Sequence, residues 1–326
     1  MPNLKSPLLS LGASGTLGQA ITFTKRRGQN IAEKKPELPY FLTLPVQYQR
    51  WLYQDYSYLW SEQSQATKDI YRSAGVRFHL TAFQYWMKYQ LTNLPDIGGM
   101  WHLDEKGGAI AHDYSRNENH GTIVGCTPGT GAIDGAQGFD GINNYINCGN
   151  HVSLRPPVIT AETFIITPTP LPSGIAGTEK YFLSRYDTPA GKRVWRLGLS
   201  NQHGALDFVD QLVIIFRKAD GSGIAYIGYY ATRLLPGTKY HVAYSFETGT
   251  LIFYVNGLPV TLTVAFGALE NSLALSDVNL TVGGRLVGGV ISAPLEHTQD
   301  HLIIWNRVLS PAQILMHADR SWPPVG

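Results

Sequence analysis

One short run constrains the fold of this 326-residue chain more than any other feature. Within Leu251–Gly257, the apolar side chains of Leu251, Phe253 and Val255 occupy every second position, which is the period of a β-strand. Asn256-Gly257 then supplies the two residues with positive φ that a tight hairpin turn requires. The sequence therefore predicts a β-hairpin in a buried sheet.

The composition agrees with a large β domain. Hydrophobic residues make up 44% of the chain and charged residues only 15%, while Gly (34), Tyr (18) and Trp (7) are abundant. Short strands joined by many turns use these residue types, and a helical enzyme or a disordered chain would look different. A chain of this length can bury a large core and still form a second, smaller unit.

The front of the chain predicts an extended arm and a basic hairpin. Residues 10–18 are rich in Gly and Ser, Gln19–Thr24 alternates, and the alternation resumes at Ile31–Glu33 after a turn at Gly28. The expected division of the chain has three parts: the arm and hairpin over 1–40, a small helical module over 41–95, and the β domain over 96–326.

Three short helices are predicted after the hairpin. Thr43, Ser61 and Thr81 are the expected N-caps, with Pro45 in the first turn of the first helix and Gly75 as the stop of the second. This small unit cannot bury all of its aromatic side chains, so we expect it to anchor the protein to an assembly. The expected anchor residues are Lys25, Arg26, Arg27, Trp51, Trp60 and Trp86.

Short motifs follow one another in this front segment: Ser14-Gly15-Thr16-Leu17-Gly18, Lys25-Arg26-Arg27-Gly28, Pro45-Val46-Gln47, Trp60-Ser61 and Ala74-Gly75. Their order over most of residues 8–91 resembles a small module that recurs in the structural genes of tailed phages. The resemblance implies a virion context. It implies no chemistry, because that family has no settled activity.

From residue 100 onward, a second set of motifs appears: Trp101–Asp104, Asp113–Thr122, Gly138–Gly141, Thr163–Ile165 and Leu302–Ser310. Their order resembles the laminin G-like jelly roll of the concanavalin A-like lectins. The resemblance implies a mainly β fold of two packed sheets, a scaffold for binding and adhesion. The chain departs from it at Leu295–His297, where the family's Phe-x-Gly is replaced and where we expect a loop.

Many jelly rolls of this type hold a calcium ion, which needs six to eight oxygen ligands. The oxygen-bearing residues at family-like rim positions are Asp113, Asn117, Asp140, Asn144, Asn256 and Asp300. The alternative is that these side chains cap their own turns. A structural calcium ion is the one cofactor that the resemblance suggests.

Sugar binding by such a sheet would use exposed aromatic faces flanked by polar groups. The candidates are Trp195 with its neighbour Arg193, and a tyrosine cluster that contains Tyr229 and Tyr230. The alternative is that these rings pack in the core or on the sheet surface.

No catalytic motif is found. Glycoside hydrolysis needs two carboxylates flanking the bond, and the nearest pair, Glu296 and Asp300, is expected to serve a loop or its solvation. A nucleophile elbow and a phosphate-binding loop are absent from the sequence. We therefore expect no enzymatic activity.

The basic hairpin has no aromatic platform for bases, so nucleic acid is not an expected partner.

No run of roughly 18–20 apolar residues could span a bilayer, and the opening segment is too weakly apolar for a signal peptide. Cys126 and Cys148 are expected to be inert thiols.

The leading hypothesis is a non-enzymatic phage structural protein, made in the host cytoplasm and incorporated into the capsid or tail of a virion. It would contact other virion proteins, form a homo-oligomer in the assembly, and expose a jelly roll that stabilises the particle or binds surface glycans. The alternatives are a free carbohydrate-binding or adhesion module and a polysaccharide-degrading enzyme.

Overall fold

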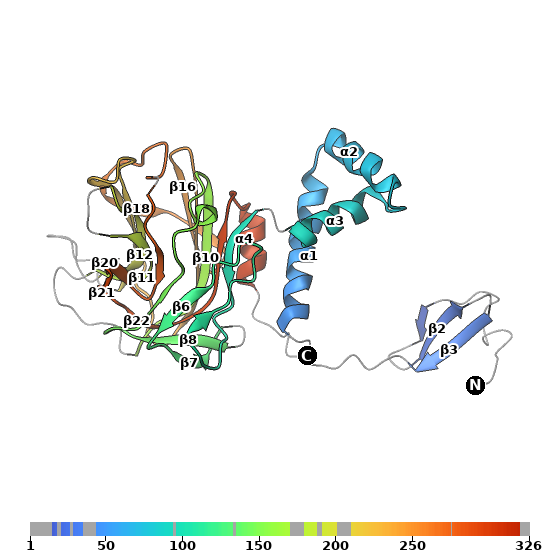
Figure 1. Cartoon of the computed structure of the whole chain (residues 1–326), viewed down its shortest axis with the longest axis horizontal. Coiled ribbons are helices and arrows are strands. Elements are labelled where there is room, and N and C mark those ends of the chain that lie inside the picture. The colour runs from blue at the N-terminus through green and yellow to red at the C-terminus, as the bar shows by residue number, and fades with distance from the viewer. Residues whose placement is uncertain are drawn as a thin grey trace. The chain divides into compact units, whose positions relative to one another are not determined.

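The computed structural model of the chain describes residues 15–17, 21–26, 29–34, 44–93, 96–132, 135–169, 179–187, 191–200, 210–274 and 276–319. The chain forms two compact units, Met1–Leu91 and Thr92–Gly326. Figure 1 shows a small sheet and helices in the first unit and layered strands in the second. None of the helices in the described ranges is long and apolar enough to cross a membrane.

The first unit begins with the predicted basic hairpin. β2 (Ile21–Arg26) and β3 (Gln29–Lys34) pair antiparallel, with Arg26 opposite Gln29. β1 (Gly15–Leu17) adds a third strand, so this part of the predicted arm is paired through its backbone. The turn residues Arg27 and Gly28 lie outside the described residues.

The three predicted helices are confirmed as α1 (Leu44–Glu62), α2 (Gln65–Val76) and α3 (Ala82–Asn93). Thr81 caps α3, because its Oγ1 accepts a hydrogen bond from the backbone N–H of Gln84 at 3.2 Å. The prediction for Ser61 is wrong: α1 continues past it, and Ser64 caps α2 instead, accepting from the N–H of Thr67. Thr43 lies outside the described residues.

Part of the predicted anchor set is packed inside this helical module. Trp86 is 6% exposed and donates its Nε1–H to the carbonyl of Tyr56 at 3.1 Å. Its ring centroid lies 4.9 Å from that of Tyr71 and 5.7 Å from that of Trp60. Trp86 is therefore a core residue and not an exposed contact, since three helices can enclose one indole. The side chain of Trp51 lies outside the described residues.

The second unit is the predicted mainly β, two-sheet jelly roll. Its eight-stranded sheet has the order β17-β16-β15-β10-β22-β8-β7, with β4 also paired to β22, and its nine-stranded sheet has the order β18-β14-β13-β12-β11-β19-β9-β6-β5. The strands of the eight-stranded sheet are β4 (Ile97–Trp101), β7 (Thr127–Thr130), β8 (Gly135–Asp140), β10 (Ile159–Ile166), β15 (Lys239–Glu247), β16 (Thr250–Val255), β17 (Leu258–Val260) and β22 (Glu296–Trp305). Those of the nine-stranded sheet are β5 (Ile110–Ala111), β6 (Gly121–Val124), β9 (Tyr145–Asn147), β11 (Glu179–Tyr186), β12 (Arg193–Ser200), β13 (Gln211–Arg217), β14 (Ile224–Tyr230), β18 (Leu262–Gly267) and β19 (Leu280–Val282). The remaining elements are the hairpin β20 (Arg285–Val287) and β21 (Val290–Ser292), a 3-10 turn at Val152–Leu154, and α4 (Pro311–Ala318).

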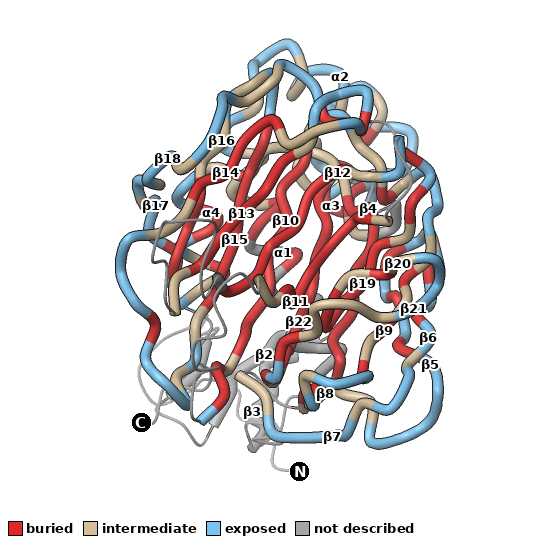
Figure 2. The backbone as a smooth tube through the Cα atoms, turned by 90° about the vertical axis from the view of Figure 1, so that its left-hand side faces the viewer, coloured by how far each residue is buried: buried red, intermediate tan, exposed pale blue. Residues whose placement is uncertain are grey.

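The two sheets enclose one hydrophobic core. Trp195 and Phe216 of the nine-stranded sheet meet Tyr244 of the eight-stranded sheet, with ring centroids 5.4 and 5.9 Å apart. Figure 2 shows that the central strands are buried along most of their length while the connecting loops are exposed. This burial of alternating side chains from both sheets is what a two-sheet sandwich requires.

Local sequence signals in this unit are mostly confirmed. Asn256 (φ +50°) and Gly257 (φ +78°) form the predicted turn between β16 and β17. Ser310 caps α4 in a reciprocal pair with Gln313. The loop predicted at Leu295–His297 is wrong, because β22 begins at Glu296 and pairs there with Asp140 on β8.

Both cysteines are free, as predicted. Cys148 is buried and Cys126 is half-buried. Burial raises the pKa of the Cys126 thiol to about 12, so it carries almost no thiolate at neutral pH.

Candidate functional site

The strands at the centre of the nine-stranded sheet have two chemically different faces. Successive side chains on a strand point to opposite faces, so Trp195 in the core places Arg196 on the outer face, away from the eight-stranded sheet. Val213, Ile215 and Ile227 form a separate apolar cluster with Tyr181. They make an apolar floor on this outer face.

The structure corrects the prediction for Trp195. Its side chain is 1% exposed and lies edge to face against Tyr244, so its indole cannot stack on a ligand from solvent. Tyr230 is half-buried and packs against the same core. Tyr229 pairs with Val213 across the strands and therefore lies on the outer face, and Arg193 donates to the carbonyl of Ser222 at 3.0 Å.

Four arginines surround the ring of Tyr186 on this outer face. The guanidinium carbons of Arg196, Arg285, Arg217 and Arg193 lie 4.6, 5.0, 5.3 and 5.8 Å from its centroid. Arg196 and Arg285 also lie 4.7 and 5.7 Å from the ring of Tyr181. These distances are within the range of cation–π attraction. We call Arg193, Arg196, Arg217 and Arg285 the arginine cluster.

The arginines reach Tyr186 from different strands. Arg193 and Arg196 belong to β12, Arg217 ends β13, and Arg285 begins β20 of the small hairpin that contacts β11. Figure 1 shows β20 and β21 beside β11 and β12. The cluster is thus assembled by sheet pairing and by one crossing hairpin.

The electrostatics of the cluster are unusual for a protein surface. Arg196 is 3% exposed, and its Nη1 lies 3.6 Å from Oε2 of Glu179. Burial, followed by repulsion from Arg196, lowers the pKa of Arg217 to about 10 and also lowers that of Arg285. All of these groups still carry their charge at neutral pH.

Several donors in the cluster have no acceptor among the described residues. They are the Nε–H groups of Arg196, Arg217 and Arg285 and the hydroxyl of Tyr181. Buried donors are normally paired, so these enclosed groups leave hydrogen-bonding capacity unused beside the cluster. A pocket of about 370 Å³ reaches two of these residues, Tyr181 and Arg285, and is also lined by Glu179, Lys180, Ser292, Ala293 and Pro294.

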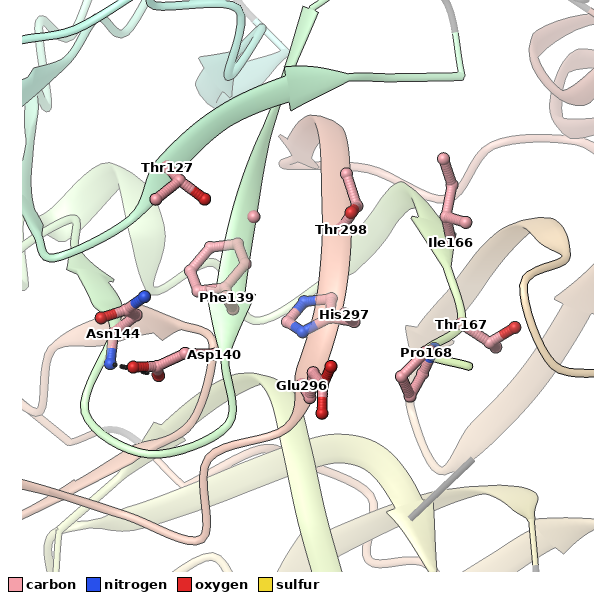
Figure 3. A pocket seen from close by; sticks show the side chains of 11 residues that line it. Thr127, Phe139, Asp140, Asn144, Ile166, Thr167, Pro168, Glu296, His297 and Thr298 are labelled. Atoms are coloured by element: carbon pink, nitrogen blue, oxygen red, sulfur yellow. Dashed lines mark hydrogen bonds between the residues drawn. The ribbon is translucent and has the colours of Figure 1, made fainter. Parts of the chain in front are cut away.

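A second pocket, of about 230 Å³, contains two residues of the predicted calcium set. Figure 3 shows Asp140 and Asn144 on one side of it and Glu296, His297 and Thr298 on another. Oδ1 of Asp140 accepts hydrogen bonds from the N–H groups of Ile142, Asn143 and Asn144, at 2.8, 3.0 and 3.2 Å. Asp140 therefore caps its own turn.

Three of the other calcium candidates, Asp113, Asn117 and Asn256, also make hydrogen bonds within the protein. Asp113 accepts four hydrogen bonds, from the N–H groups of Met100, Ser115 and Asn119 and from the Ser115 hydroxyl. Asn117 donates to the carbonyls of Ile97 and Gly98, and Oδ1 of Asn256 accepts from the N–H of His241. Asp300 is buried in β22.

The six calcium candidates are thus divided among two loops, a hairpin turn and a strand. Within the described ranges, no three His, Cys, Asp or Glu side chains lie close enough to share a metal ion. Calcium binding remains a prediction. Both carboxylate oxygens of Asp113 already accept hydrogen bonds from Met100, Ser115 and Asn119.

Sequence reasoning found Arg193 but missed Arg196, Arg217 and Arg285 as a group. The available signal was a charged residue inside or at the end of an apolar strand, as in Trp195-Arg196-Leu197 and Ile215-Phe216-Arg217. Nothing in the sequence indicates that these positions meet around one tyrosine.

Comparison with known proteins confirms the laminin G-like resemblance. The family model of the concanavalin A-like lectin/glucanase superfamily matches residues 158–315. A search of curated proteins gave no match.

A search of solved structures gave several matches at low sequence identity. Domain 4 of AbnA, a GH43 extracellular arabinanase from Geobacillus stearothermophilus, solved with arabinotriose, is 16% identical with a TM-score of 0.49 and covers 69% of this chain and 98% of that one. Trypanosoma rangeli sialidase is 15% identical with a TM-score of 0.46, over 68% of this chain and 32% of the sialidase. The binding domain of Paraclostridial Mosquitocidal Protein 1 is 14% identical with a TM-score of 0.49, over 69% and 52%. This chain therefore spans about a third of the sialidase and half of the mosquitocidal binding domain.

Proposed function

We propose that the concanavalin A-like domain of this chain binds acidic carbohydrate chains on the outer face of its nine-stranded sheet. The observation that carries this proposal is the arginine cluster, which holds four cations within 6 Å of the Tyr186 ring centroid. The superfamily includes lectins, which supports a sugar as the bearer of the acid.

Arginine suits this role better than lysine would. Its planar guanidinium is weakly hydrated and binds carboxylate, sulfate and phosphate oxygens through two parallel hydrogen bonds. Tyr181, Tyr186 and Arg196 are 0%, 5% and 3% exposed, so they form the enclosed part of the site. The ligand would contact Arg193, Arg217 and Arg285, which are half-buried. The ligand would meet a preorganised set of donors, which reduces the entropy lost on binding.

A protein surface that attracts polyanions in general would carry a large net charge. This chain has a formal net charge of +2, so its positive field at the cluster is local. A local site favours a defined ligand with a few acidic groups. The described part of the cluster offers no exposed aromatic face on which nucleic acid bases could stack.

The test is binding of the full chain to an array of neutral and acidic glycans, followed by titration calorimetry. Acidic glycans should bind, and Arg217→Gln should weaken them by at least about tenfold, which corresponds to about 1.4 kcal/mol. Arg233→Gln is the matched control. Arg217 pairs with Ile224 at the start of β14, whereas Arg233 is exposed and follows the other end of that strand, Tyr230. Equal weakening by both substitutions would reject the cluster as the site.

We also propose that the first unit attaches this domain to a larger assembly. It exposes large apolar side chains: Ile70 and Val76 on α2 are each 68% exposed, and Phe78, between α2 and α3, is 47% exposed. Such side chains are candidates for burial against a partner. A virion, as the phage-like module suggests, remains our prediction for that assembly.

A further inference from the structure

Arg185 on β11 lies inside the jelly roll, apart from the arginine cluster on the outer face. It is 3% exposed and pairs with Trp195 on β12 and with Leu280 on β19, both of which belong to the hydrophobic core. Directly paired residues of neighbouring strands have their side chains on the same face of a sheet. The guanidinium of Arg185 therefore extends between the two sheets.

This buried cation has no carboxylate beside it in the described part of the chain. Nη2 of Arg185 donates to the backbone carbonyls of Ser276 and Val278, at 2.6 and 3.3 Å, and both of these acceptors are neutral. Burial lowers the pKa of Arg185 to about 10, and repulsion from a second cation, Arg155, acts in the same direction. At neutral pH the guanidinium is still charged. An enclosed charge without an opposite charge beside it is strongly unfavourable.

Tyr244 of the eight-stranded sheet cannot supply the missing negative charge. It is close enough to Arg185 for each group to act on the pKa of the other. However, Tyr244 is 0% exposed, and burial raises its pKa well above the usual value of a phenol. The hydroxyl therefore stays protonated and neutral at physiological pH.

The hydrogen-bond donors around this guanidinium lack acceptors among the described residues. They are the Nε–H of Arg185, the Nε1–H of Trp195 and the hydroxyls of Tyr244 and Ser276, on residues that are at most 4% exposed. The ring centroid of Trp195 lies 5.4 Å from that of Tyr244. The Nε–H of arginine and the Nε1–H of tryptophan can only donate, so neither can satisfy the other. An acceptor placed among these groups would pair several of them at once.

We propose that the jelly roll binds one halide ion, of the size of chloride, between its two sheets and beside Nε of Arg185. A monatomic anion accepts hydrogen bonds from several directions, and it carries the charge that balances the guanidinium. A water molecule would accept the same hydrogen bonds but would leave the charge unbalanced. The enclosed position excludes a sugar acid on size, so the ion acts on the stability of the domain, independently of the glycan site on the outer face.

The experiment is thermal denaturation of the full chain in sodium chloride, sodium bromide and sodium gluconate at equal ionic strength, since gluconate is too large for an enclosed site. Chloride and bromide should raise the melting temperature of the jelly roll by about 5 °C relative to gluconate, when the halide exceeds its Kd about a hundredfold. Arg185→Met keeps an unbranched apolar side chain, removes the charge and should abolish this difference. Arg217→Gln is the matched control, because it removes a cation of the arginine cluster and should keep the difference.

Crystals grown from the wild-type chain after refolding in sodium bromide give a second measurement, which does not depend on whether Arg185→Met folds. An anomalous bromine peak at hydrogen-bond distance from Nε of Arg185 would support the proposal. Density for a water molecule at this position, without a bromine signal, would overturn it. A halide response that persists in Arg185→Met would also overturn it, and loss of that response in Arg217→Gln instead would assign the ion to the arginine cluster.

Discussion

Nδ1 of His317 on α4 lies 2.8 Å from Oε1 of Glu162 on β10, a buried contact that joins residues 155 positions apart. The same carboxylate accepts a hydrogen bond from Nε1 of Trp305 at 2.8 Å and lies 3.4 Å from Nε2 of His241. Burial alone would raise the pKa of Glu162, but His317 and His241 outweigh it and hold the pKa well below its usual range. Glu162 is thus an ionised group that attaches the terminal helix to the eight-stranded sheet.

Glu162→Gln should destabilise the jelly roll by about 3 kcal/mol, because it removes one partner of a buried charged pair. Chemical denaturation should show the loss, and amide exchange should show α4 losing protection first. Glu247→Gln is the control for removal of a carboxylate at an exposed position. A loss no larger than that of the control would mean that the contact contributes nothing to stability.

Stability should fall as the pH is lowered from 6.5 toward 4, partly through His102. Burial lowers the pKa of His102 to about 4, so between these values the unfolded chain binds the extra proton and the folded chain does not. The contribution is fully present above pH 6.5 and is lost as the pH falls to about 4. His102→Phe keeps a ring against Tyr114 and should flatten the pH profile over this range, whereas His112→Phe at an exposed position should not. A profile of unchanged slope would contradict this assignment.

Trp195 and Arg217, which lie on the paired strands β12 and β13 but face opposite sides of the sheet, should have different phenotypes. Trp195→Ala should destabilise the domain by about 3–5 kcal/mol, as for a buried Trp, and should abolish binding only by unfolding it. Arg217→Gln should weaken acidic glycans while leaving a folded domain. Melting temperature and glycan affinity, measured on both variants, separate the two effects. A folded Trp195→Ala protein with selectively lost binding would return Trp195 to the ligand site.

The β11–β12 pairing that positions the cluster should be sensitive at Gly198. A Cβ at this position would meet the backbone carbonyl of Lys180, so Gly198→Ala should cost about 1–3 kcal/mol through overpacking. Gly223→Ala is the matched control, since its nearest neighbours are the flexible atoms of Lys218. Thermal denaturation of both variants gives the comparison, and equal stability would refute the close approach.

Removal of residues 1–95 should leave a monomeric jelly roll, whereas the full chain should associate or incorporate into particles. The reason is the apolar surface that the first unit exposes around Phe78 and Val76. Sedimentation velocity on both proteins measures the association. Equal behaviour of the two would remove the first unit from any role in assembly.

Local features of the fold could be predicted because their causes are local. The strand over Leu251–Val255 follows from a two-residue period, and the turn at Asn256-Gly257 from the tolerance of these residues for positive φ. The capping pair of Ser310 and Gln313 needs only three residues of separation. The error at Ser61 was equally local, since the competing cap Ser64 lies one turn away.

The site could not be predicted in this way, because it depends on pairing between distant strands. Alternation along β12 shows that Trp195 and Arg196 face opposite ways, but it does not show which of them faces the core. That was decided when β12 paired with β11 and β13 and the resulting sheet packed its Trp195 face against Tyr244.

By itself, the sequence determined the class of fold, two of its hairpins and two of its helix caps, Thr81 and Ser310. The tertiary structure alone decided that Arg196, Arg217 and Arg285 meet at Tyr186. The physical reason is range: strand period and turn chemistry act over a few residues, whereas the cluster needs the register of three strands and the crossing of the β20–β21 hairpin. The four guanidinium groups are stabilised by the ring of Tyr186, which only the folded sheet brings near them.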